Sequence, residues 1–400
     1  MNQIKKTSFN NLPLILLSFA LIIFFISDGI YKIEVRGGLS SFRIGVIVKG
    51  IFTLIFFFYA IIYLSKEKNH LLFSIFILGA FFFIGQFLLV QNMTSLKISE
   101  NLNRFFKYIF ILLLYMPASD ILVSKKCPYI LLKLYKFIIW FNGIVILIAF
   151  LFSIDMFRTY IGPWRFGFDG LIYAQNEASY FFILALTTFY YRRFYLHIKE
   201  WTFWLVLITS LLVGTKAVLL YIILLLLFHI SQRVSIKKIL IAVSSIAIIG
   251  YFVFSSTINK ILLNAWQIFQ YNYEKEGLLF ALLSGRNTFI NTKLLPLIGE
   301  KWTWLNFLIG GQDVQKYYIE MGFFDLFLFF GLIGMLLYLY IFIKIYNRIT
   351  FEYKFKLFFL LALSGIIGLS GHFFTSSIAA MYFIVFILIN HYYHPKSYVE

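Results

Sequence analysis

Long apolar stretches, separated by short charged or turn-forming segments, make up most of the chain. The stretches are continuously apolar rather than alternating, which in lipid predicts helices. Because one crossing takes about 20 residues, the pattern accommodates about twelve transmembrane helices in an all-α polytopic fold. The predicted spans cover residues 12–31, 42–64, 70–90, 103–124, 131–153, 173–191, 201–214, 216–231, 236–256, 321–346, 356–371 and 373–392.

Two of the apolar stretches are too long for one crossing. Residues 201–232 carry Lys216 as their only charge, and a single helix of that length would measure about 48 Å against an apolar core of about 30 Å. A turn at Gly214-Thr215-Lys216 would make a hairpin and keep the flanking basic loops on one side. The same argument predicts a second hairpin, with its turn at residues 368–372.

Composition and charge agree with a membrane protein. The chain is 61% hydrophobic and 13% charged, whereas a soluble domain averages about 45–50% and about 25%. The net charge is +18, and loops on the side of the termini hold more than twice as many basic residues as the short loops opposite. By the positive-inside rule both termini are cytoplasmic. Topology then explains the charge, and no nucleic-acid partner is expected. We predict a single integral membrane domain over residues 1–400.

One predicted external loop, residues 257–320 between the ninth and tenth spans, is long and patterned. Apolar residues recur at helical spacing over residues 258–269, which predicts an amphipathic helix lying in the membrane interface. A second helical pattern follows Gly285 and extends to Pro296, and Gly310-Gly311 predicts a turn. A structured loop of this length in a compact bundle is usually functional.

Motifs for bound nucleotides or metals are absent from the sequence. We find no phosphate-binding glycine loop, no HExxH and no His/Asp cluster with ligand spacing, and Cys127 is the single cysteine. No cofactor and no metal are therefore expected. The remaining chemistry is that of substrates which arrive already activated or carried on a lipid.

Three basic residues on the predicted external face are candidates for binding phosphate. A guanidinium group binds phosphate through two hydrogen bonds and stays charged, which suits Arg165 and Arg286. Lys216, at a hairpin tip, is the third. Each has a simpler alternative: Arg165 anchored at lipid headgroups or paired with Asp169, Arg286 as a solvated loop cation, and Lys216 extended toward the headgroups.

Three titratable residues are candidates for proton transfer. Glu320 and Asp325 flank the start of the tenth span, and in a helix they would lie about 7.5 Å apart along the axis and about 140° around it. One face therefore cannot present both. Asp325 lies in an apolar run and should face the interior, whereas Glu320 could simply complement a helix dipole. His372 suits general base chemistry, or is a polar hairpin tip.

These features, in this order, resemble the O-antigen ligase and polymerase superfamily of bacterial envelope glycan assembly. The architecture matches over nearly the whole chain, and each motif is short. The matching segments are Arg165 to Asn176, Gly214 to Leu220, Ser284 to Arg286, Phe307 to Gly311, Glu320 with Asp325, Gly331 and Gly334, and Gly371-His372.

The resemblance implies a metal-independent glycosyltransferase that joins polyprenyl-diphosphate-linked repeat units at the external face of the bacterial inner membrane. Arg165, Arg286 and Lys216 would stabilise the leaving diphosphate. Glu320, nearest the predicted lipid boundary, would be the first candidate for the base, ahead of Asp325 and His372. The substrate contacts would include Asn176 and Tyr318. Partners would include membrane lipids and the chain-length regulator and flippase of the same pathway.

Two departures from the family pattern are informative. Thr215-Lys216 stands where members often have Ser-Arg, and a lysine cannot form the bidentate fork of an arginine. No histidine occurs between His229 and His372, where the ligase branch typically has one, which favours polymerase over ligase. A flippase or transporter is the alternative from another class. Its ionisable residues should lie at the midplane, whereas here the polar groups gather at the predicted external face.

Overall fold

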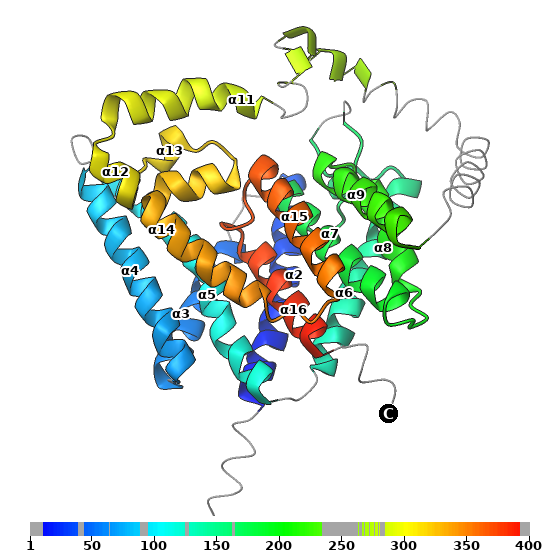
Figure 1. Ribbon diagram of the computed structural model, residues 1–400. Coiled ribbons are helices and arrows are strands. Elements are labelled where there is room, and N and C mark those ends of the chain that lie inside the picture. The colour runs from blue at the N-terminus through cyan, green and yellow to red at the C-terminus, as the bar shows by residue number, and fades with distance from the viewer. Residues whose placement is uncertain are drawn as a thin grey trace, which may run out of the picture.

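The computed structural model describes residues 11–38, 44–63, 65–88, 95–124, 128–161, 165–233 and 285–392, with scattered helical positions between 263 and 280. Within these residues the chain is helical apart from loops and one isolated β-bridge, between Arg158 and Phe168. In this described part of the chain, seven helices are long and apolar enough to cross a membrane, and three shorter helices are also apolar. The protein is therefore a helical, multi-pass membrane protein (Figure 1).

The long helices follow the predicted spans closely. They are α2 (Leu12–Arg36), α3 (Ile44–Ile62), α4 (Lys66–Leu88), α5 (Ser95–Ser124), α6 (Tyr129–Leu151), α7 (Gln175–Phe194), α8 (Thr202–Val213), α9 (Lys216–Arg233), α14 (Gly322–Tyr346), α15 (Tyr353–Ser370) and α16 (Ser377–Tyr392). Each corresponds to one predicted span, whereas the predicted span 236–256 lies outside the described residues. The count of twelve crossings therefore stays a prediction.

Both predicted hairpins are present, and their turns use left-handed backbone. Gly214 separates α8 from α9 with φ of 69°. Gly371 and His372 follow α15 with φ of 62° and 63°. Because this region of backbone space favours glycine, Gly214 and Gly371 are the residues that end their helices cleanly.

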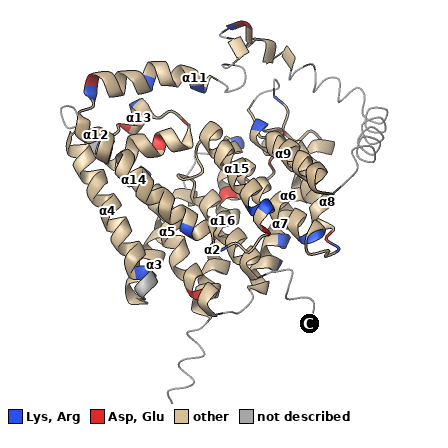
Figure 2. Cartoon of the chain, in the orientation of Figure 1, with Lys and Arg blue, Asp and Glu red and all other residues tan. Residues whose placement is uncertain are grey.

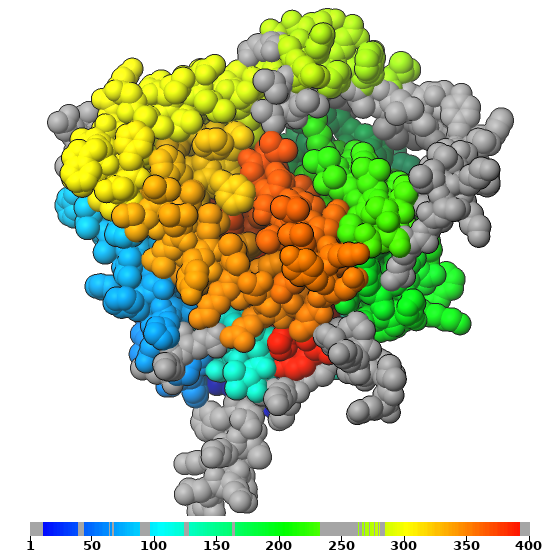
Figure 3. All heavy atoms as spheres, viewed as in Figure 1, coloured from blue at the N-terminus to red at the C-terminus, as the bar shows by residue number. Residues whose placement is uncertain are grey.

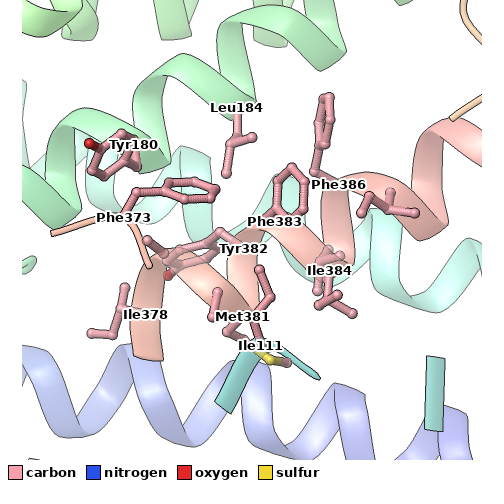
Figure 4. Packing of buried hydrophobic residues seen from close by; sticks show 14 of the residues in the cluster. Ile111, Tyr180, Leu184, Phe373, Ile378, Met381, Tyr382, Phe383, Ile384 and Phe386 are labelled. Carbon is pink, nitrogen blue, oxygen red and sulfur yellow. The ribbon is translucent and has the colours of Figure 1, made fainter. Parts of the chain in front are cut away.

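The centre of the bundle is formed by α16 and α7. Every residue of α16 from Ser377 to Asn390 is buried, although this helix is one of the shortest apolar ones. Figure 4 shows Phe373, Phe383 and Phe386 packed toward Tyr180 and Leu184 of α7. By contrast, α3 and α4 lie at the edge and expose many apolar side chains, as expected of helices that face lipid. The short helix therefore spans the core inside protein rather than against lipid.

The segment before α14 folds as helices, as its pattern predicted. Helix α11 (Arg286–Phe289) continues through the π-helical turns η3 (Ile290–Leu294) and η4 (Leu297–Lys301), beyond the predicted end at Pro296. Because proline lacks a donor and crowds the preceding turn, the wider π turns on each side accommodate it. This stretch lies over α14 (Figures 1 and 3). The amphipathic helix predicted over 258–269 falls largely outside the described residues.

The predicted turn at Gly310-Gly311 is a site of close backbone packing. It follows α12 (Trp304–Ile309) and fits against Gly331, where α14 is broken by a φ of 68°. A Cβ on Gly310 would lie 2.5 Å from the nitrogen of Gly331, and one on Gly85 of α4 would lie 3.0 Å from the Gly310 oxygen. The glycines therefore let this loop enter the helical bundle.

A buried amide network fixes the end of that loop to α4 and α5. The side chain of Asn101 donates to the Gln312 carbonyl at 3.0 Å and to the Gln86 side chain at 2.6 Å, and it accepts from the Val314 amide at 3.1 Å. Gln312 in turn donates to the Tyr317 carbonyl at 2.7 Å, at the end of α13 (Val314–Tyr317). Because buried polar groups need partners, this network determines where the following residues, 318–321, lie.

The helices carry more buried charge than the sequence suggested. Asp28 and Lys32 of α2, Lys68 of α4 and Asp325 of α14 are all buried, and of these only Asp325 was expected from the sequence to face the interior. Three of them form charged or polar contacts with residues distant in the chain. Tertiary pairing of this kind leaves no trace in a hydropathy pattern.

Candidate functional site

The loop that carries Arg165 packs directly on the α8–α9 hairpin tip. The Phe168 amide donates to the Leu212 carbonyl at 2.8 Å, and the Thr159 hydroxyl donates to the Val213 carbonyl at 2.8 Å. Gly214 lies so close to the Phe166 carbonyl that a Cβ there would overlap it. Two of the sequence motifs therefore form one structural unit, which holds exposed Arg165 and exposed Lys216 at the same end of the bundle.

The alternative pairing of Arg165 with Asp169 is wrong. Asp169 is buried and forms an ion pair with Lys32 of α2, which also donates to the Ile172 carbonyl at 3.0 Å. Arg165 instead lies over the ring of Tyr160, with the guanidinium carbon 5.1 Å from the ring centre. The Lys32–Asp169 pair anchors the loop before α7 to α2, and the guanidinium group of Arg165 is exposed.

Arg286 connects three segments. It begins α11 after Gly285, whose φ is 81°. One terminal nitrogen lies 3.6 Å from the Glu320 carboxylate, and the other donates to the Leu369 carbonyl at 3.3 Å. The positive charges of Arg165 and Arg286 both lie close enough to Lys216 to repel its ammonium group. The structure thus brings the three predicted phosphate-binding cations into electrostatic reach of one another, although they are far apart in sequence. Figure 2 shows basic residues at the end of α11 and beside α9 on the same side of the bundle.

Glu320 and His372 lie on two loops whose backbones touch. Glu320 has φ of 65° and His372 has φ of 63°, and a Cβ on Gly371 would overlap the Glu320 carbonyl oxygen. The Tyr180 hydroxyl of α7 donates to the Gly371 carbonyl at 2.7 Å. Left-handed backbone at a residue other than glycine costs of order 1–3 kcal/mol and is concentrated at functional sites. Here the packing of the two loops against each other, and the hydrogen bond from Tyr180, keep Glu320 and His372 in this conformation.

His372 is half-buried beside Tyr318 and close to several cations. Its Nδ1 lies 3.1 Å from the Tyr318 hydroxyl, and the Arg104 guanidinium lies 4.3 Å from the centre of the Tyr318 ring. Burial, together with the charges of Arg104, Arg286 and Lys107, lowers the pKa of His372 to about 4. Burial raises the pKa of Tyr318 to about 12. At neutral pH the site therefore holds a neutral imidazole and a neutral phenol.

The carboxylate of Asp325 is hydrogen-bonded to the backbone of the loop that precedes α14. Its two carboxylate oxygens accept hydrogen bonds from the amides of Ile319 and Met321, each at 2.9 Å. These bonds bracket Glu320 and hold it in its left-handed conformation. The space beside Asp325 has no room for a water molecule and is surrounded by Tyr108, Tyr318, Gly322, His372, Phe374 and Thr375. Glu320 and Asp325 do not share a face, as the sequence predicted: Glu320 extends toward Arg286 and Asp325 toward the backbone.

Asn176 lies in the first turn of α7, half-buried, and its side chain forms no hydrogen bond to another predicted site residue within the described part of the chain. The next residue, Glu177, is tied to the same region, because the Ser376 hydroxyl donates to its carboxylate at 2.6 Å. Ser376 lies in the loop that follows His372. The start of α7 and the α15–α16 loop are therefore joined.

Sequence reasoning missed Arg104, Tyr160 and the Lys32–Asp169 pair. The signal for Lys32 was present, because a lysine four residues after Asp28 in an apolar helix needs a partner. Nothing in the sequence indicated that this partner would be Asp169, or that Arg104 would stack on Tyr318. Such contacts join segments separated by more than a hundred residues.

Comparisons with known proteins identify no relative: no family model, no curated protein and no solved structure matches this chain. In the described residues no group of three His, Cys, Asp or Glu side chains could hold a metal ion. The case for a function therefore rests on the geometry of this site and on the motif resemblance.

Proposed function

We propose that this protein is a polysaccharide polymerase that joins polyprenyl-diphosphate-linked oligosaccharide repeat units at the external face of a bacterial cytoplasmic membrane. The observation that carries the proposal is the grouping of Arg165, Lys216 and Arg286 beside Glu320 and His372. Five separate loops contribute to this grouping. It combines cations suited to a diphosphate with groups able to accept a proton.

The cations would stabilise the leaving group. When the bond between the sugar and its diphosphate breaks, negative charge develops on the diphosphate, and fixed positive groups lower the energy of that transition state. Arg165 and Arg286 can each bind phosphate oxygens through two donors. Lys216 is the first residue of α9, so its charge adds to the positive end of the helix dipole.

A carboxylate or an imidazole would accept the proton of the attacking hydroxyl. In the reaction, the acceptor oxygen bonds to the sugar carbon, the bond from that carbon to the diphosphate oxygen breaks, and the proton passes to the base. Glu320 is the first candidate, because its side chain is 41% exposed and lies at Arg286. His372 is the second. Asp325, whose oxygens are engaged, would act as a positioning residue, and Asn176 and Tyr318 would contact the substrate.

Membrane topology and partners belong to the same proposal. Twelve crossings with both termini in the cytoplasm would place the candidate site outside the membrane. The partners would be lipid-linked glycans, membrane lipids, and the flippase and chain-length regulator of the same pathway. A ligase that transfers finished glycan to a lipid A core or another acceptor would use the same chemistry.

A flippase or transporter for lipid-linked oligosaccharide is the second candidate, favoured by buried Asp28 and Lys32 within α2. Deleting the gene and examining the surface glycan separates the three functions. Single repeats on the usual anchor indicate a polymerase, and full-length chains left on polyprenyl lipid indicate a ligase. One-repeat lipid accumulating on the cytoplasmic face indicates a flippase and contradicts the proposal.

A further inference from the structure

A second pocket lies beside the phosphate-binding cations, at the junction of α2, the loop before Arg165 and the start of α7. It is an open pocket of about 330 Å³, lined by Val35, Arg36, Thr159, Tyr160, Ile161, Tyr173 and Gln175. This volume is within the range of about 300–1,000 Å³ typical of small-molecule sites. Thr159 and Tyr160 also support the loop that carries Arg165, whereas the other five residues play no part in the site described above.

The lining of this pocket matches a polar, ring-shaped ligand. Tyr160 and Tyr173 offer aromatic faces, and Tyr173 is held in place by an edge-on contact with Tyr31, with ring centres 4.6 Å apart. Arg36 and Gln175 supply donors and an acceptor. The lining has no carboxylate side chain, which a cation site would need. Its apolar residues Val35 and Ile161 are interspersed with Arg36, Thr159 and Gln175, so it lacks the continuous apolar wall that a polyprenyl chain would need. Sugars, with apolar faces and hydroxyl edges, fit this combination.

The position of the pocket connects it to the proposed diphosphate site. Tyr160 lines the pocket and also contacts Arg165, whose guanidinium carbon lies 5.1 Å from the centre of the Tyr160 ring. In a lipid-linked glycan the first sugar is bonded directly to the diphosphate. A diphosphate held at Arg165 would therefore place its first sugars at Tyr160.

Arg36 is the charged group of this pocket. It is half-buried, and one terminal nitrogen donates to the Arg158 carbonyl at 3.3 Å. Among the described residues no carboxylate lies within 4.0 Å of it, whereas the neighbouring Arg158 is paired with Asp155 at 2.9 Å. Its remaining donors can therefore bind ligand oxygens.

From these observations we infer that the pocket lined by Arg36, Tyr173 and Gln175 binds the diphosphate-proximal sugars of the lipid-linked glycan. This inference rests on the proposed function, because it takes the cations at Arg165 to hold the diphosphate. It adds a saccharide subsite, in which Arg36 and Gln175 bind sugar oxygens and the tyrosine rings cover a sugar face.

The test measures binding to the purified full-length protein in detergent. The probes are the lipid-linked repeat unit extracted from cells that lack the gene, and polyprenyl diphosphate without sugar. For R36Q and Q175L we expect about tenfold or more weaker binding of the sugar-bearing probe, because a ligand hydrogen bond to each side chain is lost. Binding of bare polyprenyl diphosphate should stay unchanged, which also shows that the variants fold. R158Q is the matched control and should bind both probes normally.

The outcomes separate the inference from the proposed function. If R36Q and Q175L bind the sugar-bearing probe as tightly as the wild type, the saccharide subsite is wrong and the diphosphate site survives. The subsite is also wrong if phosphatidylglycerol vesicles compete for the pocket and the oligosaccharide released by mild acid does not. If the wild type binds neither probe, the proposed function fails and the inference fails with it.

Discussion

The two ends of the helical bundle hold their charges in different ways. At the end where α4, α6 and α8 begin, basic side chains form short ion pairs in which at least one partner is buried. Lys68 lies 2.5 Å from Asp120, and Glu200 lies 2.8 Å from both Lys136 and Arg192. The opposite end also has a buried pair, Lys32 with Asp169, which anchors the loop that carries Arg165. The candidate site at that end differs, because Arg286 is 3.6 Å from Glu320, the longest ion pair within the described residues. Arg165 and Lys216 are exposed there.

Under the proposed function, this difference would separate charges that stabilise the fold from charges that bind the substrate. A buried ion pair must satisfy both partners to offset their desolvation, which explains the short distances at the first end. A group that must bind an external anion cannot be neutralised in the same way. Under the proposed function, the Arg286–Glu320 pair would open when a diphosphate approaches, and the Glu320 carboxylate would be freed as it opens. The following experiments compare the two ends, from the largest expected effect to the smallest.

Replacing Arg286 by alanine should give the largest effect, a loss of chain extension by about 100-fold to 1,000-fold, because one electrostatic stabiliser of the transition state is removed. R286K should retain part of the activity, since a charge remains without the fork. The measurement is glycan chain length in cells and the polymerisation rate of purified protein. R193A, at the other end of α7, is the control. Wild-type chains in R286A at normal protein level would contradict the site.

Gly371→Ala should damage both stability and activity. The new Cβ would overlap the Glu320 carbonyl, and the backbone there has φ of 62° and ψ of −168°, so we expect a loss of about 3 kcal/mol in unfolding free energy. Thermal unfolding in detergent measures it. Gly365→Ala on the same helix is the control, because nothing lies within 4 Å of a Cβ there. Equal melting temperatures for the two variants would disprove the close packing of the loops.

Lys68→Met should lower stability without changing the chemistry. It leaves Asp120 without its ion pair, and because Asp120 is one-third exposed we expect a loss of about 2–3 kcal/mol, below the range for fully buried pairs. The double variant with Asp120→Asn should recover part of it. Polymerisation per folded molecule should match the wild type. A specific loss of activity in Lys68→Met would mean that the two ends are not functionally distinct.

The smallest effect should be a pH dependence carried by His372. Its pKa is lowered to about 4 in the folded protein, against about 6.5 in the unfolded chain. Between these values the unfolded chain binds more protons, so this contribution to stability is complete above pH 6.5 and falls as the pH drops toward 4. We expect the free energy of unfolding to fall by at most about 2 kcal/mol between pH 7 and pH 5, and this fall should be absent in His372→Gln. The same pH slope in both proteins would contradict the burial of His372.

Sequence reasoning succeeded where the signal is local. The apolar runs predicted eleven helices that the structure describes, and the glycines at 214, 310, 311 and 371 predicted turns. The continuation of the helix past Pro296 was missed, because π turns depend on hydrogen-bond registers that no pattern displays. Asp325 was correctly expected to face the interior, but its two amide partners follow from a loop conformation that residue spacing does not specify.

The sequence by itself determined that this is a helical membrane protein and where most of its helices begin and end. Apolar length and turn residues are sufficient for that, because each helix satisfies its own backbone in lipid. Tertiary structure alone decided which charges meet: Asp169 with Lys32 rather than Arg165, and Arg286 with Glu320. Those pairings depend on how loops and helices that are separated in the sequence pack together, and a charge in a linear sequence carries no record of its neighbour in space.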